Sequence, residues 1–327
     1  MKVLVVSPVF HGYWQAIAAG LAVHGHEVST HCYDAGDRRA RLRNAVAQRV
    51  SATRARHESA ATDEAIAALR RMLPDAVLVV KGDALGSSWW DAVARSGART
   101  AVWLYDELSR MRYSVETLRS VERVHSYSPH DVETLRTAGV AAANLPDGYD
   151  SFTPFQARRS EAVTFVGARY PGRVHSLRVL AARDIPVVAY GREWSRHPWD
   201  VARTGLWRSS GVPGRRDLPR ADYYGVMAGS LATLNVHGDG HDGFSMRTFE
   251  ASGVGGLQLI DRPDVARHYD VGSECLVFTS DDELVDHVEH ARREPAWADR
   301  IRAAGRERTL AEHTLAHRMG EVQRQWA

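Results

Sequence analysis

The stretch LATLNVHGDGHDGFSMRTFEASGVGGLQLI, residues 231–260, shows most clearly how this chain is built. It begins with an apolar run that ends at Val236 and continues through a glycine-rich polar loop. The pattern then becomes helical from Met246 to Ser252, and a second apolar run covers Gly256–Ile260. Strand, loop, helix and strand in this order predict one unit of a parallel sheet, because parallel strands need a crossover between them.

The same alternation of short apolar runs and amphipathic stretches extends through the chain. Further strands are predicted at Val3–Val6, Glu27–His31, Ala76–Val80, Thr100–Leu104, Val121–Tyr127, Val163–Val166, Pro186–Tyr190 and Leu276–Phe278. Helices are predicted at Trp14–His24, Thr62–Met72 with a Thr62/Asp63 cap, Ser88–Arg95, Ser128–Gly139, Val174–Arg183, Glu283–Ala291 and from about Trp297 onward. Strands that are apolar on nearly every residue are typical of a sheet covered on both faces, so the pattern predicts an α/β fold.

Residues 146–160, PDGYDSFTPFQARRS, interrupt the alternation and are the best linker candidate. The chain therefore divides into a Rossmann-like domain over 1–150 and a second one over 155–311, with a C-terminal helix at about 312–327 that packs back on the first. Two doubly wound domains facing each other across a cleft are expected. Ligands bind such domains at the carboxyl ends of the strands.

Composition argues against several classes of protein. Lysine and arginine number 42 against 40 acidic residues, so bulk charge does not indicate a nucleic-acid coat. The two cysteines are far apart and the histidines lack metal-ligand spacing, which disfavours disulfide and zinc frameworks. No apolar run suits a signal peptide or a membrane span. A cytoplasmic protein without metal or cofactor is expected, with the arginine-rich segment 37–57 as an exposed helix or loop that could form a basic patch.

The loop and helix start after Val236 have the features of a phosphate site. Backbone N–H groups and the helix dipole favour an anion there, with Ser245 as the N-cap. Arg247 in the first turn opposes the dipole unless an anion is bound. Carboxylates at Asp242 and Glu250 can accept hydrogen bonds from sugar and ribose hydroxyls. A flexible loop that binds nothing is the alternative.

Other candidates follow predicted strands. Arg169 and Arg173 come shortly after Val163–Val166, where they could neutralise a diphosphate or be ordinary surface arginines. Trp194, after Gly191, is either a stacking residue for a nucleotide base or a packed core aromatic.

The first half of the chain offers fewer candidates. The loop after the first strand carries His11, Gly12 and Tyr13, and these residues could meet an acceptor. Asp106 and Glu107 follow Thr100–Leu104, and Asp106 could orient an acceptor hydroxyl or cap a helix.

Four segments in order resemble one enzyme family. They are TFVGARYPGRVHSLRVLAARDIPVVAYGREW (164–194), ADYYGVMAGSLATLNVH (221–237), DGFSMRTFEASGVGGLQLIDRPD (242–264) and AAGRERTLAEHTLAHRM (303–319). They resemble the carboxyl-half signature of the group 1 glycosyltransferases, retaining enzymes of the GT-B fold, and are closest to the CgeB-like branch. The family usually carries glutamate where this chain has Asp242.

The resemblance implies a hexosyltransferase-type enzyme that moves a sugar from a UDP- or GDP-sugar to an acceptor hydroxyl, with retention and without metal. The nucleotide sugar is then a co-substrate rather than a cofactor. The candidate donor-binding residues are Arg169, Arg173, Gly191, Trp194, His237, Gly243, Phe244, Ser245, Met246, Arg247 and Glu250. The candidate catalytic residues are His11, Asp106 and Asp242, and the acceptor contacts are Gly12, Tyr13 and Glu107.

Two other functions fit the same pattern. One is a nucleotide-sugar epimerase or hydrolase of GT-B shape, and the other is a non-catalytic nucleotide-sugar-binding protein. The sequence leaves the acceptor open among a small molecule, a glycan or lipid intermediate, and a modified nucleic-acid base. A Glu250→Ala change is expected to weaken donor binding and to leave folding largely intact.

Overall fold

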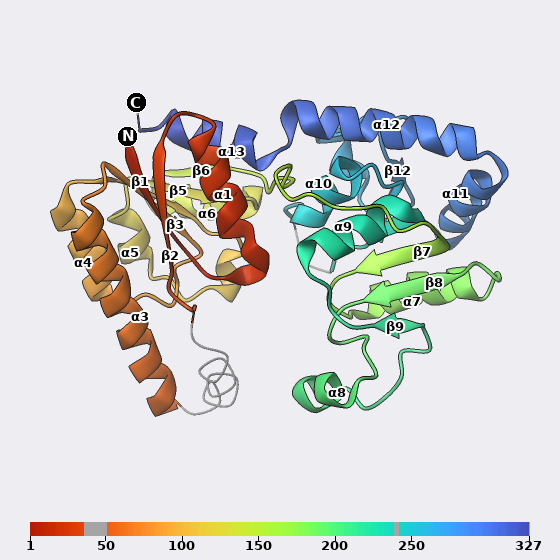
Figure 1. The fold of residues 1–327 in the computed structure, drawn as a ribbon, viewed down its shortest axis with the longest axis horizontal. Helices are drawn as coiled ribbons and strands as arrows, with labels where there is room; N and C mark the ends of the chain where they lie inside the picture. Colours follow the sequence, from red (N-terminus) through yellow and green to blue (C-terminus); the bar gives the residue numbers. More distant parts are fainter. Residues whose placement is uncertain (36–50, 239–241, 327) are drawn as a thin grey trace. The chain divides into compact units, whose positions relative to one another are not determined.

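The chain folds into two α/β units (Figure 1). The structure is a computed structural model that describes residues 1–35, 51–238 and 242–326, without the side chains of 51–57. The N-terminal unit comprises Met1–Asp147 and Leu315–Ala327, and the C-terminal unit comprises Gly148–Thr314. No helix within the described ranges combines the length and the apolar character needed to cross a membrane.

A six-stranded parallel sheet in the order β2-β1-β3-β4-β5-β6 forms the centre of the N-terminal unit. The strands are β1 (Lys2–Ser7), β2 (Glu27–Cys32), β3 (Ala76–Val80), β4 (Arg99–Trp103), β5 (Arg123–Ser126) and β6 (Ala142–Asn144). The helices are α1 (Tyr13–Ala22), α3 (Ser51–Met72), α4 (Ser87–Ser96), α5 (Val115–Arg119), α6 (Pro129–Thr137) and α13 (Leu315–Gln323), with 3-10 turns η1 (Phe10–Gly12) and η2 (Leu108–Arg110). Strand order reverses between β1 and β3.

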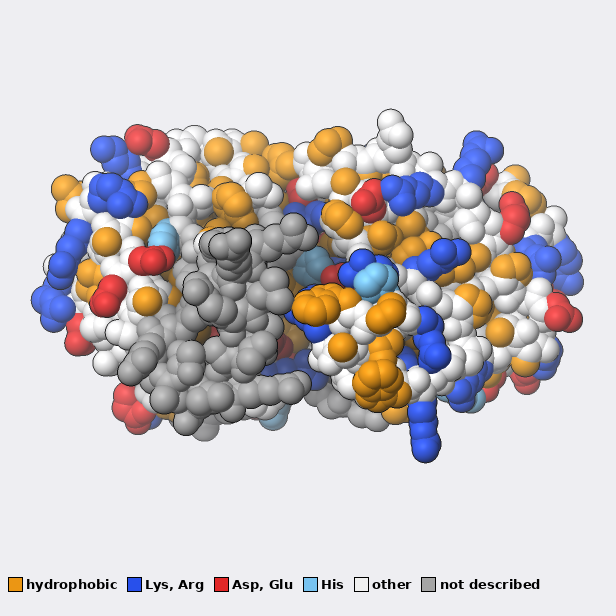
Figure 2. Space-filling view, turned by 60° about the horizontal axis from the view of Figure 1, so that its bottom comes forward, with side chains coloured by type: hydrophobic (Ala, Val, Ile, Leu, Met, Phe, Trp, Pro, Cys, Tyr) orange, Lys and Arg blue, Asp and Glu red, His pale blue; other side chains and the backbone are white. Residues whose placement is uncertain are grey.

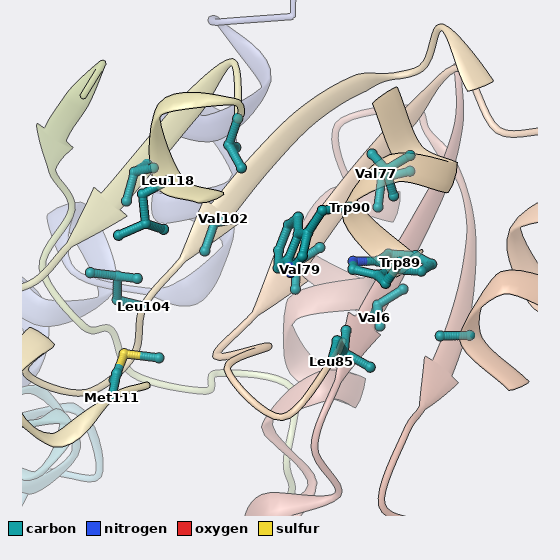
Figure 3. Close-up of a cluster of buried hydrophobic side chains, with 14 of the residues drawn as sticks. Val6, Val77, Val79, Leu85, Trp89, Trp90, Val102, Leu104, Met111 and Leu118 are labelled. Atoms are coloured by element: carbon teal, nitrogen blue, oxygen red, sulfur yellow. The ribbon is translucent and has the colours of Figure 1, made fainter. Parts of the chain in front are cut away.

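Apolar side chains cover this sheet. Figure 3 shows Trp89 and Trp90 of α4 against Val77 and Val79 of β3, within a cluster to which α3 and α5 also contribute. The helices α1 and α13 pack against one another, and a Cβ on Gly20 would lie 2.9 Å from the Met319 side chain. The C-terminal helix belongs to this unit because its apolar face is buried there.

The C-terminal unit has its own six-stranded parallel sheet, in the order β12-β11-β10-β7-β8-β9. The strands are β7 (Ser160–Val166), β8 (Val187–Tyr190), β9 (Gly214–Arg215), β10 (Ser230–Asn235), β11 (Gln258–Ile260) and β12 (Leu276–Val277). The helices are α7 (Pro171–Ala181), α8 (Pro198–Thr204), α9 (Arg220–Gly229), α10 (Met246–Gly253), α11 (Asp281–Arg293) and α12 (Pro295–Glu312), with a 3-10 turn η3 (Pro263–Arg267). Strand order reverses between β7 and β10.

Two apolar clusters enclose the second sheet. One contains side chains of α7, α11 and α12, including Leu177, Leu284 and Ile301. The other contains side chains of α9 and α10, including Tyr223 and Phe249. The predicted α/β fold class, with apolar strands covered by helices, is confirmed.

Some predicted boundaries are wrong. The helix expected to begin at a Thr62 cap begins at Ser51, and Thr62 lies inside it with its hydroxyl donating to the Glu58 carbonyl oxygen over 2.6 Å. A threonine that bonds back to the preceding turn is compatible with a helix interior, which local sequence cannot distinguish from a cap. The segment 37–57 was expected to be exposed. Its residues 37–50 lie outside the described part of the chain, and residues 51–57 belong to α3.

Other elements were missed or merged. The helical stretch from about Trp297 is two helices, because the chain leaves helical geometry at His313 before α13 begins. Three helices were not predicted, namely α5, α8 and α9, and neither were the strands β6 and β9. These elements are short, and α9 contains two glycines that weaken its helical signal.

Gly305 in α12 provides a test of this packing. A Cβ at Gly305 would lie 2.3 Å from the Glu274 carbonyl oxygen, whereas a Cβ at Gly172 in α7 would meet its nearest atom only at 3.8 Å. We expect Gly305→Ala to lower the free energy of unfolding by about 1–3 kcal/mol, as overpacking does. Gly172→Ala is the matched control and should change it by less than about 1 kcal/mol. Equal stabilities in urea denaturation would contradict the close approach of α12 to Glu274.

Candidate functional site

Two arginines cross-link the ends of β7 and β10 at the carboxyl edge of the C-terminal sheet. Arg173, in the first turn of α7, donates from Nε to the Val236 carbonyl oxygen over 2.7 Å. Arg247, in the first turn of α10, donates from Nε to the Val166 carbonyl oxygen over 3.3 Å. Each arginine follows one strand and bonds to the end of the other. Strand order reverses between these two strands, which is where doubly wound domains bind ligands.

A buried carboxylate holds Arg247 in place. The Arg247 guanidinium pairs with Glu250 and lies over the Tyr223 ring, 4.3 Å from its centroid. Glu250 is fully buried, and its Oε1 accepts hydrogen bonds from the hydroxyls of Tyr223 at 2.9 Å and Tyr224 at 3.1 Å. This environment makes Glu250 a support for Arg247, and the predicted contact of Glu250 with a ribose stays a prediction.

Arg173 is a largely enclosed cation with neighbours of both charges. Burial lowers the pKa of the Arg173 guanidinium, and nearby Arg247 acts in the same direction, whereas Tyr170 and Asp261 oppose it. The Arg173 guanidinium also lies over the rings of Tyr170 and Phe165, at 4.5 and 5.0 Å from their centroids. Arginine keeps its proton in proteins, so the lowered pKa reflects mainly the cost of taking the Arg173 charge out of water. An anion bound at this edge would offset part of that cost.

Arg169 lies in the loop between β7 and α7. Its backbone N–H donates to the Glu193 carboxylate over 2.6 Å. Its guanidinium makes longer contacts, 3.4 Å to the Glu193 carbonyl oxygen and 3.3 Å to the Arg208 carbonyl oxygen. The backbone of Arg169 is therefore well held, while its charged group is held weakly enough to turn toward an anion.

His237 and Asp261 form a hydrogen-bonded pair at the ends of β10 and β11. The Asp261 carboxylate accepts from the His237 backbone N–H at 3.0 and 3.1 Å and lies 2.9 Å from its Nδ1. This geometry assigns the ring proton to Nδ1. The Nε2 atom of His237 is buried, and no described residue bonds to it. Buried polar atoms without partners are uncommon, and they are worth noting beside a candidate ligand site.

The described part of the loop before α10 is held by Arg262. The Arg262 guanidinium donates to the Asp242 carbonyl oxygen over 2.9 Å and lies 4.6 Å from the centroid of the Phe244 ring. Phe244 is buried and meets the His237 ring edge-on. Phe244 thus anchors the loop through its side chain, which leaves the loop backbone as the part that can contact a ligand.

The start of α10 is an anion-compatible helix terminus. Ser245 occupies the N-cap position, as predicted, but its side chain makes no capping hydrogen bond. Gly243 is buried, whereas Ser245 and Met246 are half-buried. The first N–H groups of a helix have no partner within the helix, so a phosphate at this place would satisfy them.

The residue proposed to stack on a nucleotide base, Trp194, belongs to the hydrophobic core. Its side chain is 2% exposed, packs against Phe165 and donates from Nε1 to the Gly167 carbonyl oxygen over 2.9 Å. Gly191 lies in the same packing, because a Cβ there would be 2.5 Å from the Gly167 oxygen. Burial of a large apolar ring with its N–H satisfied stabilises the fold. The expectation of stacking is therefore corrected to a structural role for Trp194.

The tryptophans that are exposed lie further along, in an excursion between β8 and β9 that contains α8. Trp199 is 49% exposed and Trp207 is 74% exposed. The exposed arginines of this region are Arg192, Arg196, Arg203, Arg208, Arg215 and Arg216. Figure 2 shows hydrophobic side chains gathered over α8 with basic side chains around them. The excursion therefore presents a cationic surface with two exposed indole rings.

In the N-terminal unit, Asp106 lies beside a lysine at the carboxyl ends of β3 and β4. Its Oδ2 is 2.9 Å from Lys81 Nζ, and its Oδ1 accepts from the Glu107 backbone N–H over 3.0 Å. Glu107 is mostly buried, 3.5 Å from Arg110 Nε, and it rather than Asp106 occupies the N-cap position of η2. The helix-cap alternative for Asp106 is therefore not observed.

The other residues predicted for this unit lie at the end of β1. His11 is exposed and Gly12 half-buried, and both have left-handed backbone conformations, with φ of 44° and 72°. Tyr13 is buried, and its ring lies 5.7 Å from the Tyr105 ring. His11 and Gly12 are thus open to a ligand, whereas Tyr13 contributes mainly to packing in this structure.

Sequence reasoning missed several of these residues. Lys81 directly follows the predicted strand Ala76–Val80, and Asp261 directly follows Gly256–Ile260. The rule that picked out Asp106, a polar residue at the carboxyl end of a strand, would have found both. Tyr223 and Tyr224 carried no such signal, because the helix that places them beside Glu250 was not predicted.

Comparison with known proteins identifies the fold. A family model described as "Glycosyl transferase-like" matches residues 173–324. The structure of sucrose-phosphate synthase from Thermosynechococcus elongatus is similar over 99% of this chain and 98% of its own, with a TM-score of 0.64 at 15% identity. The chain has the GT-B fold.

Two further structures share this GT-B fold over their whole length. Anabaena HepE in complex with UDP-glucose has a TM-score of 0.63 at 12% identity, covering 99% of this chain and 98% of that protein. A DNA-modifying β-glucosyltransferase, solved with and without UDP-glucose, has a TM-score of 0.63 at 12% identity. The similarity covers 100% of this chain and 99% of that protein. A search of curated proteins found no match. The comparisons establish the fold across both units.

The role of Glu250 can be tested through stability. Its full burial overturns the expectation that Glu250→Ala leaves folding intact, because the change leaves Arg247 and two tyrosine hydroxyls without their shared partner. We expect a loss of about 3–5 kcal/mol in the free energy of unfolding, as for other broken buried pairs. Glu250→Gln keeps the shape and an acceptor oxygen and should lose less.

Glu312→Ala is the control for this change, because Glu312 pairs with Arg308 on the surface of α12. It should alter stability by less than about 1 kcal/mol. Chemical denaturation measures all three variants. Equal values for Glu250→Ala and Glu312→Ala would contradict the buried network.

Proposed function

We propose that the protein is a glycosyltransferase that binds a nucleoside diphosphate sugar at the carboxyl ends of β7 and β10. The observation that carries this proposal is the reciprocal pair of bonds from Arg173 to the Val236 oxygen and from Arg247 to the Val166 oxygen. It puts two guanidinium groups at the point where strand order reverses, next to the start of α10. A diphosphate is an anion that guanidinium groups and a helix start can bind. The family model that matches residues 173–324 includes both arginines.

The donor contacts follow from the same geometry. Arg169 and Arg173 face the diphosphate, and the backbone from Gly243 to Met246 contacts its oxygens. Asp242 and His237 are the candidates for sugar and ribose hydroxyls, and the buried Glu250 acts through Arg247. In the transfer, the bond from the anomeric carbon to the diphosphate oxygen breaks, and a bond from that carbon to the acceptor oxygen forms. The guanidinium groups stabilise the negative charge that develops on the leaving diphosphate.

The finer assignment follows the resemblance in residues 164–319. It makes the protein a group 1, CgeB-like enzyme that retains anomeric configuration and works without a metal ion. The leaving diphosphate then takes the proton of the acceptor hydroxyl. HepE, which shares the fold, was solved with UDP-glucose, and this supports a nucleotide-sugar donor.

The experiment that tests the function combines binding with product release. Thermal-shift measurements with UDP- and GDP-sugars should show a donor that raises Tm, because a ligand at 100 times its Kd adds about 2.7 kcal/mol to stability. Release of nucleoside diphosphate should then require an acceptor. Conversion or hydrolysis of the donor without any acceptor would support an epimerase or hydrolase instead. Binding without turnover for every acceptor would support a non-catalytic binding protein.

Arg169 can be used to test the proposed diphosphate site. Its guanidinium makes long hydrogen bonds, of 3.3 and 3.4 Å, to the carbonyl oxygens of Arg208 and Glu193, so removing it should disturb the fold little. We expect Arg169→Ala to raise the Kd for the nucleoside diphosphate about 10- to 100-fold, the loss of one charge-assisted hydrogen bond. Arg183→Ala is the matched control, since Arg183 lies just beyond the opposite end of α7 and pairs with an exposed Asp282. Calorimetric titration that finds equal affinities for both variants would exclude Arg169 from the site.

The nucleotide base has a stacking partner in the excursion. The resemblance assigns the base to the region after β8, and Trp207 precedes Arg208, whose carbonyl oxygen contacts Arg169. We propose that the base stacks on the exposed Trp207 instead of the buried Trp194. Trp207→Ala should weaken nucleotide binding by about 1–3 kcal/mol, the usual value of base–aromatic stacking. Trp199→Ala, at the other exposed tryptophan, should leave the affinity unchanged, and fluorescence titration distinguishes the two.

A further inference from the structure

Strained backbone is concentrated at the carboxyl edge of the N-terminal sheet. Among the described residues, non-glycine residues with positive φ are His11 (44°), Leu73 (46°), Lys81 (61°), Tyr105 (59°) and Asp184 (56°). Leu73 and Asp184 lie just after α3 and α7, where left-handed residues commonly end helices. The other three follow β1, β3 and β4, which are consecutive neighbours in the sheet, and strand order reverses between β1 and β3. Strain of this kind persists where the surrounding structure enforces it, and it clusters at functional sites.

Backbone contacts hold Lys81 in its strained conformation. Its N–H donates to the Trp103 carbonyl oxygen over 2.8 Å, and its own carbonyl oxygen accepts from the Tyr113 hydroxyl over 2.6 Å. Burial raises the pKa of Tyr113 well above its usual value, so this hydroxyl keeps its proton and remains a donor. The position of Lys81 is therefore fixed by two neighbouring segments, and its side chain leaves the sheet in a defined direction.

The strained positions bring two side chains of opposite charge together. Tyr105 directly precedes Asp106, and the Asp106 carboxylate lies 2.9 Å from Lys81 Nζ. The two side chains are 27% and 36% exposed. A carboxylate offers about four acceptor positions and an ammonium group three N–H donors, so the pair can bond to further groups.

Stability does not account for this arrangement. An ion pair that is this exposed contributes little to folding, because solvent screens it. Left-handed conformations at a lysine and a tyrosine both oppose folding. The native structure thus holds Lys81 and Tyr105 in unfavourable backbone conformations, and the ion pair between Lys81 and Asp106 is too weak to offset them. Such a combination is expected where the residues are needed for binding.

We propose that Lys81 and Asp106 together bind a polyhydroxylated acceptor. Lys81 donates a hydrogen bond to the oxygen of the hydroxyl that receives the sugar, and Asp106 accepts one from the neighbouring hydroxyl. A donor and an acceptor 2.9 Å apart match two adjacent hydroxyl groups, each of which both donates and accepts. The inference rests on the proposed glycosyltransferase function and names the chemical class of its acceptor.

The bonding changes in the transfer step are defined. The oxygen of the hydroxyl that accepts from Lys81 forms a bond to the anomeric carbon while the bond from that carbon to the diphosphate breaks. The hydroxyl proton goes to the leaving diphosphate. Lys81 and Asp106 keep their protonation states and act by orienting the acceptor.

Lys81→Asn is the most informative variant. Asparagine removes the cation and adopts left-handed backbone more readily than lysine does. We expect Tm to equal or exceed that of the wild type, and donor affinity to stay unchanged. The ratio kcat/KM for polyol acceptors should fall about 10- to 100-fold, the loss of one charge-assisted hydrogen bond. Lys81→Arg keeps a cation and should recover part of that loss.

Leu73→Asn is the matched control, because Leu73 is also left-handed and is exposed at the end of α3. It should change Tm in the same direction as Lys81→Asn and leave transfer unchanged. Acceptors with adjacent hydroxyls, such as glycosides and sugar alcohols, should be used at least about 10-fold more efficiently than simple alcohols of one hydroxyl.

Three outcomes would overturn the inference. They are wild-type transfer by Lys81→Asn, a loss of transfer that follows a loss of Tm, and equal use of alcohols with one hydroxyl. Donor binding is measured first, without acceptor. Absence of donor binding would refute the proposed function itself, and that result is separate from all three.

Discussion

The C-terminal unit depends on a charge balance at the end of one sheet. Glu250 is fully buried, and its carboxylate is bonded to Arg247 and to the hydroxyls of Tyr223 and Tyr224. Taking a carboxylate out of water costs several kcal/mol, so each of these partners is needed. The network fixes α9 against α10, and it aims Arg247 at the end of β7. The start of α10 is placed at the edge of the sheet for the same reason.

The two units have different chemistry at equivalent edges of their sheets. The carboxyl edge between β7 and β10 gathers guanidinium groups and a helix start, which suits a polyanion. The edge after β3 and β4 carries a lysine and an aspartate that form an ion pair, with Arg110 3.9 Å from the same aspartate, on a backbone held in left-handed conformations. Side-chain donors and acceptors of opposite charge that lie side by side suit uncharged hydroxyl groups. The two edges therefore differ in charge although both sheets are parallel with a reversal of strand order, because the residues that follow the strands differ.

The segment between β8 and β9 begins with a buried tryptophan, Trp194, and carries an exposed one, Trp207. Trp194 anchors the start of this segment in the core through its bond to the Gly167 oxygen. Asp200, which is buried, pairs with Arg216 and ties α8 to the end of the segment. Because both ends of the segment are held, exposing Trp207 requires little additional loss of conformational entropy. The excursion therefore behaves as a part of the domain surface and not as a loose loop.

Hydrophobic periodicity alone determined much of this protein. The runs at Val3–Val6, Ala76–Val80 and Leu231–Val236 identified buried parallel strands, because only a sheet covered on both faces needs such continuous apolar character. The change from strand to glycine loop to helix before Met246 located the start of α10 at Ser245. These features are local, since they depend on residues a few positions apart.

Tertiary structure alone decided which side chains are available. Sequence left Trp194 open between stacking on a base and packing in the core, and it predicted a ligand contact for Glu250. In the structure Phe165 and Gly167 enclose Trp194, while Tyr223 and Tyr224 bond to Glu250. Lys81 became a candidate site residue only in the structure, where the pairing of β3 with β4 places it beside Asp106. The physical reason is that burial and charge pairing depend on neighbours distant in the chain, which a local pattern of hydrophobicity does not encode.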